Sequence, residues 1–235
     1  MNGRETGRTT TVPEVRVSGS EPPGKGLTDE LNAACAAVEG AGGSVPLVLR
    51  LGGAEPDPAE FASVGVHLVN KWEQALRRVE RLGAVTVAVV EGPCTGTALE
   101  LLVCCDHRIG SPETTFRAPV VESTPWPGMV LHRLVTQLGV ARARGLVLFA
   151  PRIDAARAVE LGLLDEVSED VAAALVDVLV RCGDVAGSEV AVRRQLLLDA
   201  TSTSFEEALG VHLAACDRTL RHERGQTPAE PFPQW

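Results

Sequence analysis

The sequence predicts an α/β fold with a helical C-terminal extension, and three features of the chain carry this prediction. Segments of strand length alternate with segments of helical periodicity over residues 14–167. One strand segment, residues 85–90, is a continuous run rich in β-branched side chains, which is typical of a strand buried on both faces of a sheet. Over residues 168–224, helical segments follow one another without a strand between them. We therefore expect a tail (1–13), an α/β core (14–167) and a C-terminal helical region (168–235).

Strands are predicted in the first half of the chain where polar and apolar residues alternate or where a short apolar run lies between turn residues. These segments are residues 14–18, 45–51, 85–90 and a short stretch around 108–109. Helices are predicted where apolar residues recur at helical spacing. These segments are residues 27–39, with Thr28 as the N-cap, residues 61–82 and residues 97–105.

Short helices separated by glycine or proline are predicted in the second half of the core. They cover residues 130–138, 141–149 and 154–161, and the end of a strand is expected within 163–167. The C-terminal region is predicted to be helical, with Ser168 and Ser188 as N-caps.

Composition and charge exclude several classes of protein. The net charge is −9 and only 3% of the residues are aromatic, whereas a nucleic-acid binder needs a basic surface or stacking rings. No apolar run reaches the ~18 residues of a membrane-spanning helix, and residues 1–11 hold no apolar segment of the secretory kind. The six cysteines form no Cys-x-x-Cys pair. We therefore expect a cytoplasmic protein with reduced thiols and no metal site, which binds neither nucleic acid nor membrane.

The candidate site lies where the strand predicted over residues 85–90 turns through glycines into a buried helix. The backbone N–H of Thr97 lies in the first turn of that helix, and Glu100 follows three residues later, just under one turn away. An N–H at Thr97 could stabilise an oxyanion while the carboxylate of Glu100 moves a proton. The structural alternative is equally open: Glu100 pairs with an arginine such as Arg108, or lies in the first turn as a charge on the helix dipole.

The tract over residues 85–110 resembles the signature of the crotonase (enoyl-CoA hydratase/isomerase) superfamily. The matching residues are Gly92, Gly96, Glu100, Leu101, Cys105, Asp106, Arg108 and Ile109. Further matches follow in the same order at Phe116, Pro119, Pro127, Gly128 and over residues 141–167. The resemblance implies a crotonase-like ββα spiral core, with the C-terminal helices (168–235) as the oligomerisation region of a homotrimer or hexamer.

The same resemblance implies a set of roles for individual residues. Two backbone N–H groups, those of Ala54 and Thr97, would polarise the carbonyl of an acyl-CoA thioester, and Glu100 would be a catalytic glutamate. Hydratases of the family carry a second glutamate where this chain has Val120, and Glu122 is the candidate substitute, with a solvated loop carboxylate as the alternative. No metal or redox cofactor is implied, because coenzyme A is part of the substrate.

Two further residues are candidates for the substrate pocket. Trp126 lies between two prolines and could form a wall of an acyl pocket or pack in the core. His132 lies near the loop that should border the active site.

The short, altered form of the chain is most similar to the small crotonase homologue of 3,5-dihydroxyphenylglycine biosynthesis in producers of glycopeptide antibiotics. That similarity implies an acyl-CoA lyase (a dehydratase) acting with a type III polyketide synthase in the formation of 3,5-dihydroxyphenylacetyl-CoA, through dehydration and aromatisation of a thioester. The alternative is a catalytically degenerate crotonase that binds or activates a synthase or a true hydratase.

Overall fold

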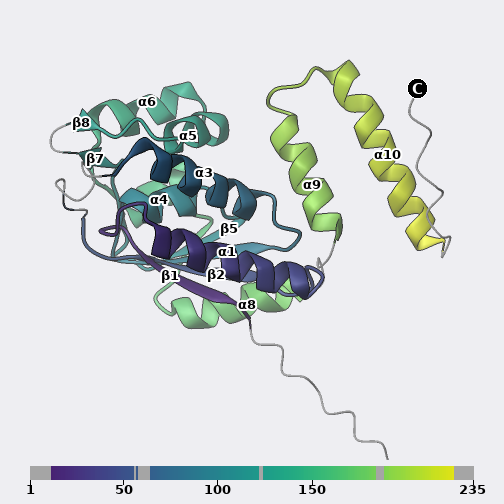
Figure 1. The fold of residues 1–235 in the computed structure, drawn as a ribbon, viewed down its shortest axis with the longest axis horizontal. Helices are drawn as coiled ribbons and strands as arrows, with labels where there is room; N and C mark the ends of the chain where they lie inside the picture. Colours follow the sequence, from purple (N-terminus) through teal and green to yellow (C-terminus); the bar gives the residue numbers. More distant parts are fainter. Residues whose placement is uncertain (1–11, 56, 58–63, 122–123, 184–187, 225–235) are drawn as a thin grey trace, which may run out of the picture. The chain divides into compact units, whose positions relative to one another are not determined.

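The computed structural model describes residues 12–55, 57, 64–121, 124–183 and 188–224. The chain forms two compact units, one that ends at Val190 and one that begins at Ala191. The first unit holds the sheet and the helices that cover it, and the second is helical (Figure 1). This architecture confirms the predicted α/β fold with a helical C-terminal region.

Five parallel strands form the main sheet, in the order β1-β2-β3-β5-β10. Their bounds are Glu14–Ser18 (β1), Leu47–Gly52 (β2), Thr86–Glu91 (β3), His107–Gly110 (β5) and Glu166–Val167 (β10). Gly52 lies opposite both Ser18 and Glu91, so β1, β2 and β3 end together at one edge. The central strand β3 is buried from Thr86 to Val90, as expected of a strand covered on both faces.

Helices cover both faces of this sheet (Figure 1). One face packs on the helices between β1 and β10, which are α1 (Lys25–Gly40), α3 (Val66–Glu80), α4 (Gly96–Leu102), α5 (Val130–Leu138), α6 (Val140–Phe149) and α7 (Ala155–Leu161). The other face packs on α8 (Val171–Gly183). Side chains of one strand alternate between the two cores: Leu47 and Leu49 face the first, and Val48 faces α8.

Very short strands extend the fold beyond the main sheet. Pro93–Cys94 (β4), Thr115–Phe116 (β6) and Ile153–Asp154 (β9) form a three-stranded sheet, and Val120–Val121 (β7) pairs with Thr124–Pro125 (β8). None of these was predicted, because two residues carry no periodicity.

Two of the predicted N-caps are wrong. Helix α1 begins at Lys25, so Thr28 lies inside the helix, where its hydroxyl donates to the carbonyl of Gly24 at 2.7 Å. Helix α8 begins at Val171, and the carboxylate of Asp170 accepts the N–H of Ala173 at 2.9 Å. Ser168 instead accepts the N–H of Asp170 at 3.1 Å, within the preceding turn. A carboxylate thus takes the capping position that we assigned to the serine.

The second unit contains most of α9 (Ser188–Asp199) and all of α10 (Phe205–Glu223). Ser204 and Glu207 form a capping box at the start of α10, with bonds of 2.9 Å from the N–H of Ser204 and 3.3 Å from the N–H of Glu207. Large apolar side chains of this unit are exposed: Leu197, Phe205, Leu209, Val211, Leu213 and Leu220.

The described residues show the state of the cysteines, the arrangement of possible metal ligands and the lengths of the helices. None of the six cysteines, all of which lie in the described ranges, forms a disulfide, and only Cys216 is exposed. Within the described ranges, no cluster of His, Cys, Asp and Glu has the arrangement of a metal site. No helix there has the length and apolar character needed to cross a membrane.

Candidate active site

Glu100 lies on α4, a helix whose seven residues are all buried. The helix follows β3 through the turn that contains Gly92 and Gly96, both of which have positive φ angles, 77° and 54°. The side chain of Glu100 points away from water, with 1% of the residue exposed. A carboxylate in such surroundings needs hydrogen-bond donors, because burial removes the water that would otherwise solvate it.

Two tryptophan side chains supply those donors. The indole N–H of Trp72, on α3, donates to Oε2 of Glu100 at 2.6 Å. The side chain of Trp126, which follows β8, also hydrogen-bonds to Glu100. Gly128 lies beside this contact, since a Cβ there would be 2.6 Å from Nε1 of Trp126 and 2.9 Å from Oε1 of Glu100.

The protonation of Glu100 is set by opposing effects. Burial raises the pKa of its carboxyl group to about 7, and the hydrogen bond from Trp72 acts in the opposite direction. Glu73 adds to the increase by charge repulsion, whereas Arg133 and the bond from Trp126 lower the pKa. A carboxyl group with a pKa near neutral can both accept and donate a proton at physiological pH.

An ion-pair network lies next to the Glu100 carboxylate, between α3 and α5. Arg133 donates from Nε to Glu80 at 2.7 Å and from a terminal nitrogen to Glu73 at 2.9 Å. Arg133 and Glu80 are 7% and 6% exposed, so each buried charge is neutralised by the other.

A cleft of about 380 Å³ opens beside this network. Its lining is formed by Glu73, Gln74, Arg77, Glu80, Met129, His132 and Arg133. Two residues that line the cleft directly follow residues that lie against the Glu100 carboxylate. Glu73 follows Trp72, and Met129 follows Gly128.

The two candidate oxyanion donors lie at the same edge of the sheet, where β2 and β3 end. Ala54 is exposed two residues beyond β2, and Thr97 is fully buried at the start of α4. Both segments contact Ser18. The hydroxyl of Thr97 donates to the Ser18 carbonyl at 3.2 Å, and a Cβ on Gly53 would be 2.4 Å from the Ser18 hydroxyl.

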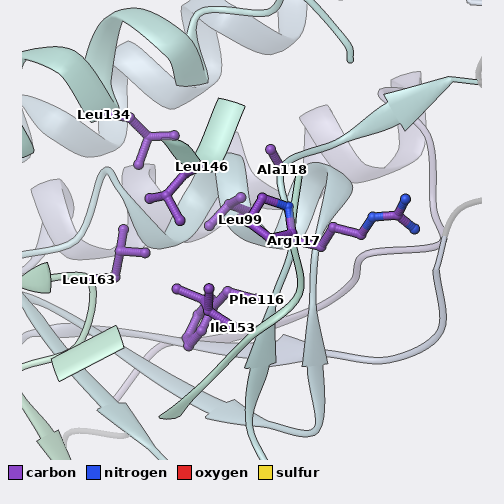
Figure 2. A pocket seen from close by; sticks show the side chains of 9 residues that line it. Leu99, Phe116, Arg117, Ala118, Leu134, Leu146, Ile153 and Leu163 are labelled. Atoms are coloured by element: carbon purple, nitrogen blue, oxygen red, sulfur yellow. The ribbon is translucent and has the colours of Figure 1, made fainter. Parts of the chain in front are cut away.

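Ion pairs of Glu55, the residue after Ala54, hold the loop that carries Ala54. The carboxylate of Glu55 pairs with Arg152 and, at 3.4 Å, with Arg117. Figure 2 shows the guanidinium of Arg117 pointing away from the apolar side chains around it, and its Nε donates to the carbonyl of Ala150 at 3.1 Å.

The apolar cavity drawn in Figure 2 does not have the size of a substrate site. Leu99, Phe116, Leu134 and Leu146 are among the side chains around a volume of about 10 Å³. A single water molecule needs about that much space, so this region is part of the packed core and not an acyl pocket.

Arg108 does not pair with Glu100, and the arginine that acts on the Glu100 carboxylate by charge is Arg133. Arg108 donates to the carbonyls of Cys105 (3.2 Å) and Val103 (3.3 Å) and to Gln137 (2.7 Å), which places its charge at the C-terminal end of α4. Glu100 is the fifth residue of α4 and lies outside the first turn.

The other candidate residues are distributed unevenly around Glu100. Trp126 contacts it, whereas His132 is exposed on α5 and lines the cleft. Val120 pairs with Pro125 in the hairpin of β7 and β8. Glu122 lies outside the described residues.

Sequence reasoning missed Trp72, which we treated only as one of the apolar positions of its helix. A signal was available, since a buried tryptophan usually finds a hydrogen-bond acceptor for its N–H. The buried Glu100 needed a donor of this kind. The distance of 28 residues between the two hid the pairing.

The fold is of the α/β class, with a parallel sheet that leads into a short buried helix carrying an ionisable carboxyl group. Solved structures share this fold. An enoyl-CoA hydratase/isomerase from Marinobacter aquaeolei superposes with a TM-score of 0.74 at 22% identity, over 93% of this chain and 96% of that chain. An enoyl-CoA hydratase from Polaromonas sp. JS666 has a TM-score of 0.78 at 19% identity, over 92% of both chains. At these identities the likeness concerns the fold, which is the mixed α/β crotonase fold.

Sequence comparison carries the assignment further. The enoyl-CoA hydratase/isomerase family model matches residues 64–225. A protein of Amycolatopsis orientalis described as an enoyl-CoA-hydratase is 43% identical over 209 residues, which are 89% of this chain and 96% of that protein. The mitochondrial Delta(3,5)-Delta(2,4)-dienoyl-CoA isomerase of Dictyostelium discoideum is 25% identical over 79% of this chain and 58% of its own length. The chain belongs to the enoyl-CoA hydratase/isomerase family, the crotonase superfamily that the sequence motifs indicate.

Proposed function

We propose that the protein is an acyl-CoA-processing enzyme in which Glu100 moves a proton at the carbon next to the thioester carbonyl. The observation that carries the proposal is the buried Glu100 carboxyl group, whose pKa is raised to about 7 by burial. A group that changes charge near neutral pH can take a proton in one step and return it in the next. Membership of the enoyl-CoA hydratase/isomerase family supports this class of chemistry.

In the proposed reaction, the N–H groups of Ala54 and Thr97 bind the oxygen of the thioester carbonyl. The Glu100 carboxylate removes a proton from the α-carbon, and the electrons of the broken C–H bond form an enolate. The enolate collapses to a Cα=Cβ double bond and expels a β-hydroxyl group. That group takes the proton back from Glu100 and leaves as water, so one carboxyl group serves as base and then as acid.

We propose the cleft between α3 and α5 as the place of the acyl group. Its charged residues form pairs, with Arg133 on Glu73 and Glu80 and with Arg77 on Glu80 at 3.1 Å, so the cleft offers donors and acceptors without a large net charge. An uncharged, oxygen-bearing acyl chain suits such a lining better than a plain alkyl chain. His132, which lines the cleft, would then contact the acyl group.

At the finest level, we propose dehydration and aromatisation of a polyketide-derived thioester, with a type III polyketide synthase as partner and 3,5-dihydroxyphenylacetyl-CoA as product. The polar lining of the cleft supports an oxygenated substrate. The lyase assignment, a cytoplasmic location, and assembly as a homotrimer or hexamer belong to the same proposal.

A second candidate function is that of a catalytically degenerate crotonase that activates a synthase or a true hydratase. Two observations favour it. Glu100 is 1% exposed, and Val120 occupies the position of the second glutamate of the hydratases. Under this hypothesis the protein alone changes no acyl-CoA, and Glu100→Gln raises the output of the partner enzyme as well as the wild type does.

The first test is proton exchange at the α-carbon of phenylacetyl-CoA in deuterated buffer, followed by NMR. We expect the wild type to exchange this proton and Glu100→Gln to be slower by about 10²-fold or more, because the variant keeps the shape of the side chain and loses the base. Exchange that is equally fast in both proteins would remove Glu100 from the mechanism.

The second test is calorimetric binding of acetoacetyl-CoA and of free coenzyme A to the wild type. A preference of more than ~1 kcal/mol for the thioester is expected if two N–H groups bind its carbonyl. Equal affinities would indicate a coenzyme A site without an oxyanion hole. Failure to bind either compound would favour the second candidate function.

A further inference from the structure

We propose that the indole N–H groups of Trp72 and Trp126 position the carboxylate of Glu100 for proton transfer, which makes both tryptophans positioning residues of the active site. The inference rests on the proposed function, since it concerns the same carboxylate. It goes beyond that function because neither tryptophan belongs to the motif that the chain shares with its family.

The contact of Trp72 is more than core packing. Trp72 is 1% exposed on α3, and its ring could be buried there without meeting any polar group. Its N–H nevertheless lies 2.6 Å from Oε2 of Glu100, which is within hydrogen-bond distance. The bond joins α3 to α4 at the one carboxylate on α4.

Trp126 is held at the same carboxylate by the chain around it. Prolines precede and follow it, and its backbone N–H donates to the carbonyl of Pro119 at 2.8 Å. Gly128 leaves the space that the indole occupies, because a Cβ there would be within 3 Å of both Nε1 of Trp126 and Oε1 of Glu100. The loop is therefore built to bring this ring to the carboxylate.

Indole suits this task because its N–H donates and never accepts. Two such donors fix the plane of the carboxylate and stabilise its ionised form against burial, but they cannot take up the proton that Glu100 moves. Other groups act on the same carboxylate by charge, namely Glu73 of α3 and Arg133 of α5. Cys104, just beyond α4, donates to the backbone carbonyl of Glu100 at 3.2 Å and does not contact the carboxylate. Glu80 forms an ion pair with Arg133 and is the other charged residue of this network.

The inference is tested by ¹⁵N labelling of tryptophan and NMR of the indole N–H groups between pH 5.5 and 8.5. We expect the resonances of Trp72 and Trp126 to move with one common midpoint near pH 7, because both bonds report the charge of Glu100. Neither resonance should move in Glu100→Gln. Assignment follows from the loss of one resonance in Trp72→Phe and of another in Trp126→Phe.

The same variants give a functional readout that packing alone would not alter. Loss of either N–H should raise the midpoint of the pH–rate profile of α-proton exchange by about one pH unit, because the ionised carboxylate loses a charge-assisted bond. Leu76→Val is the matched control: it removes volume from the buried face of α3 without removing a donor, and the midpoint should stay unchanged. Gly128→Ala should act like Trp126→Phe.

If Trp72→Phe fails to fold, the indole of Trp72 can be replaced by benzothiophene, which has the same shape with sulfur in place of N–H. An unchanged midpoint in that protein, or indole resonances that do not titrate with Glu100, would overturn the inference. These outcomes are distinct from failure of the proposed function. If the proposed function is wrong, Glu100→Gln exchanges the α-proton as fast as the wild type, whether or not the indole resonances titrate.

Discussion

Glu100 links the charge state of a single side chain to the stability of the fold. Its folded-state pKa of about 7 lies above the ordinary value of 4.5, so the folded protein holds its proton more tightly than the unfolded chain does. The resulting stabilisation is complete below pH 4.5 and is lost progressively as the pH rises to 7. The size of the loss is about 3 kcal/mol at most, from 1.36 kcal/mol for each pKa unit.

We therefore predict that Glu100→Gln becomes more stable relative to the wild type as the pH rises from 4.5 to 7. Glutamine carries no titratable proton, so the penalty for ionising a buried carboxyl group is absent in the variant. Urea unfolding of both proteins at several pH values measures the difference, in which the contributions of all other titrating groups cancel. Substitution of the exposed Glu113 by glutamine serves as control, and a difference that is constant with pH would contradict the prediction.

The residues of the candidate site differ in how far the sequence could predict them. Glu100 and Thr97 stand at fixed spacing in a motif, and the predicted helix around them is confirmed as α4. Trp72 and Arg133 approach Glu100 from other helices, and their local sequence does not name Glu100 as their partner, even though a buried indole N–H needs an acceptor. Their position depends on how α3 and α5 pack, which single-sequence periodicity does not contain.

Helices α3 and α5 are joined by ion pairs of one buried arginine, Arg133, with Glu73 and Glu80. We predict that Arg133→Met destabilises the protein by about 3 kcal/mol, because Glu73 and the buried Glu80 lose this partner and Glu80 keeps only its bond from the half-exposed Arg77. Chemical unfolding measures the change.

The matched control is Arg157→Met, which removes one partner of a pair with Glu160 in which both side chains are more than half exposed. Its expected effect is below about 1 kcal/mol. A similar effect of both substitutions would show that the Arg133 pairs contribute no more than surface pairs. Restoring neutrality with a second change, Glu80→Gln, should recover part of the loss in Arg133→Met.

The strands of the main sheet and the helices of the core could be predicted, whereas the two-residue strands outside the main sheet could not. Residues 14–18 and 130–138 have the predicted bounds, because several turns or alternations of pattern define them. The predicted 97–105 helix ends earlier, at Leu102, where Arg108 donates to the carbonyl of Val103 just beyond. Caps were predicted less well, since any nearby Ser, Thr or Asp can take the position.

Large apolar side chains remain exposed to solvent in the single chain. In the second unit this exposed apolar surface includes Phe205 and Leu197, which are 76% and 73% exposed. We predict that the purified protein is a homotrimer of about 74 kDa, three times the 24.8 kDa chain, or a hexamer of twice that mass. Light scattering after size exclusion measures the mass.

The control is Phe205→Glu together with Leu213→Glu, which places charges on this apolar surface and should lower the mass to that of the monomer. A monomeric wild type at micromolar concentration would contradict the prediction. At this scale the sequence predicted the fold class and the helical C-terminal region. It contained no signal for the strand order, which depends on contacts between distant segments.

The parallel arrangement of the main sheet also governs how the chain reaches its native state. Every neighbouring pair of strands is joined through at least one helix, and β5 pairs with β10 across more than 50 residues. No hairpin can start such a sheet, so the entropy of closing long loops must be lost before the pairings contribute, and folding should be slow. During synthesis, β5 remains an open edge until Val167 has left the ribosome, and that nascent intermediate is the species most exposed to pairing with another chain.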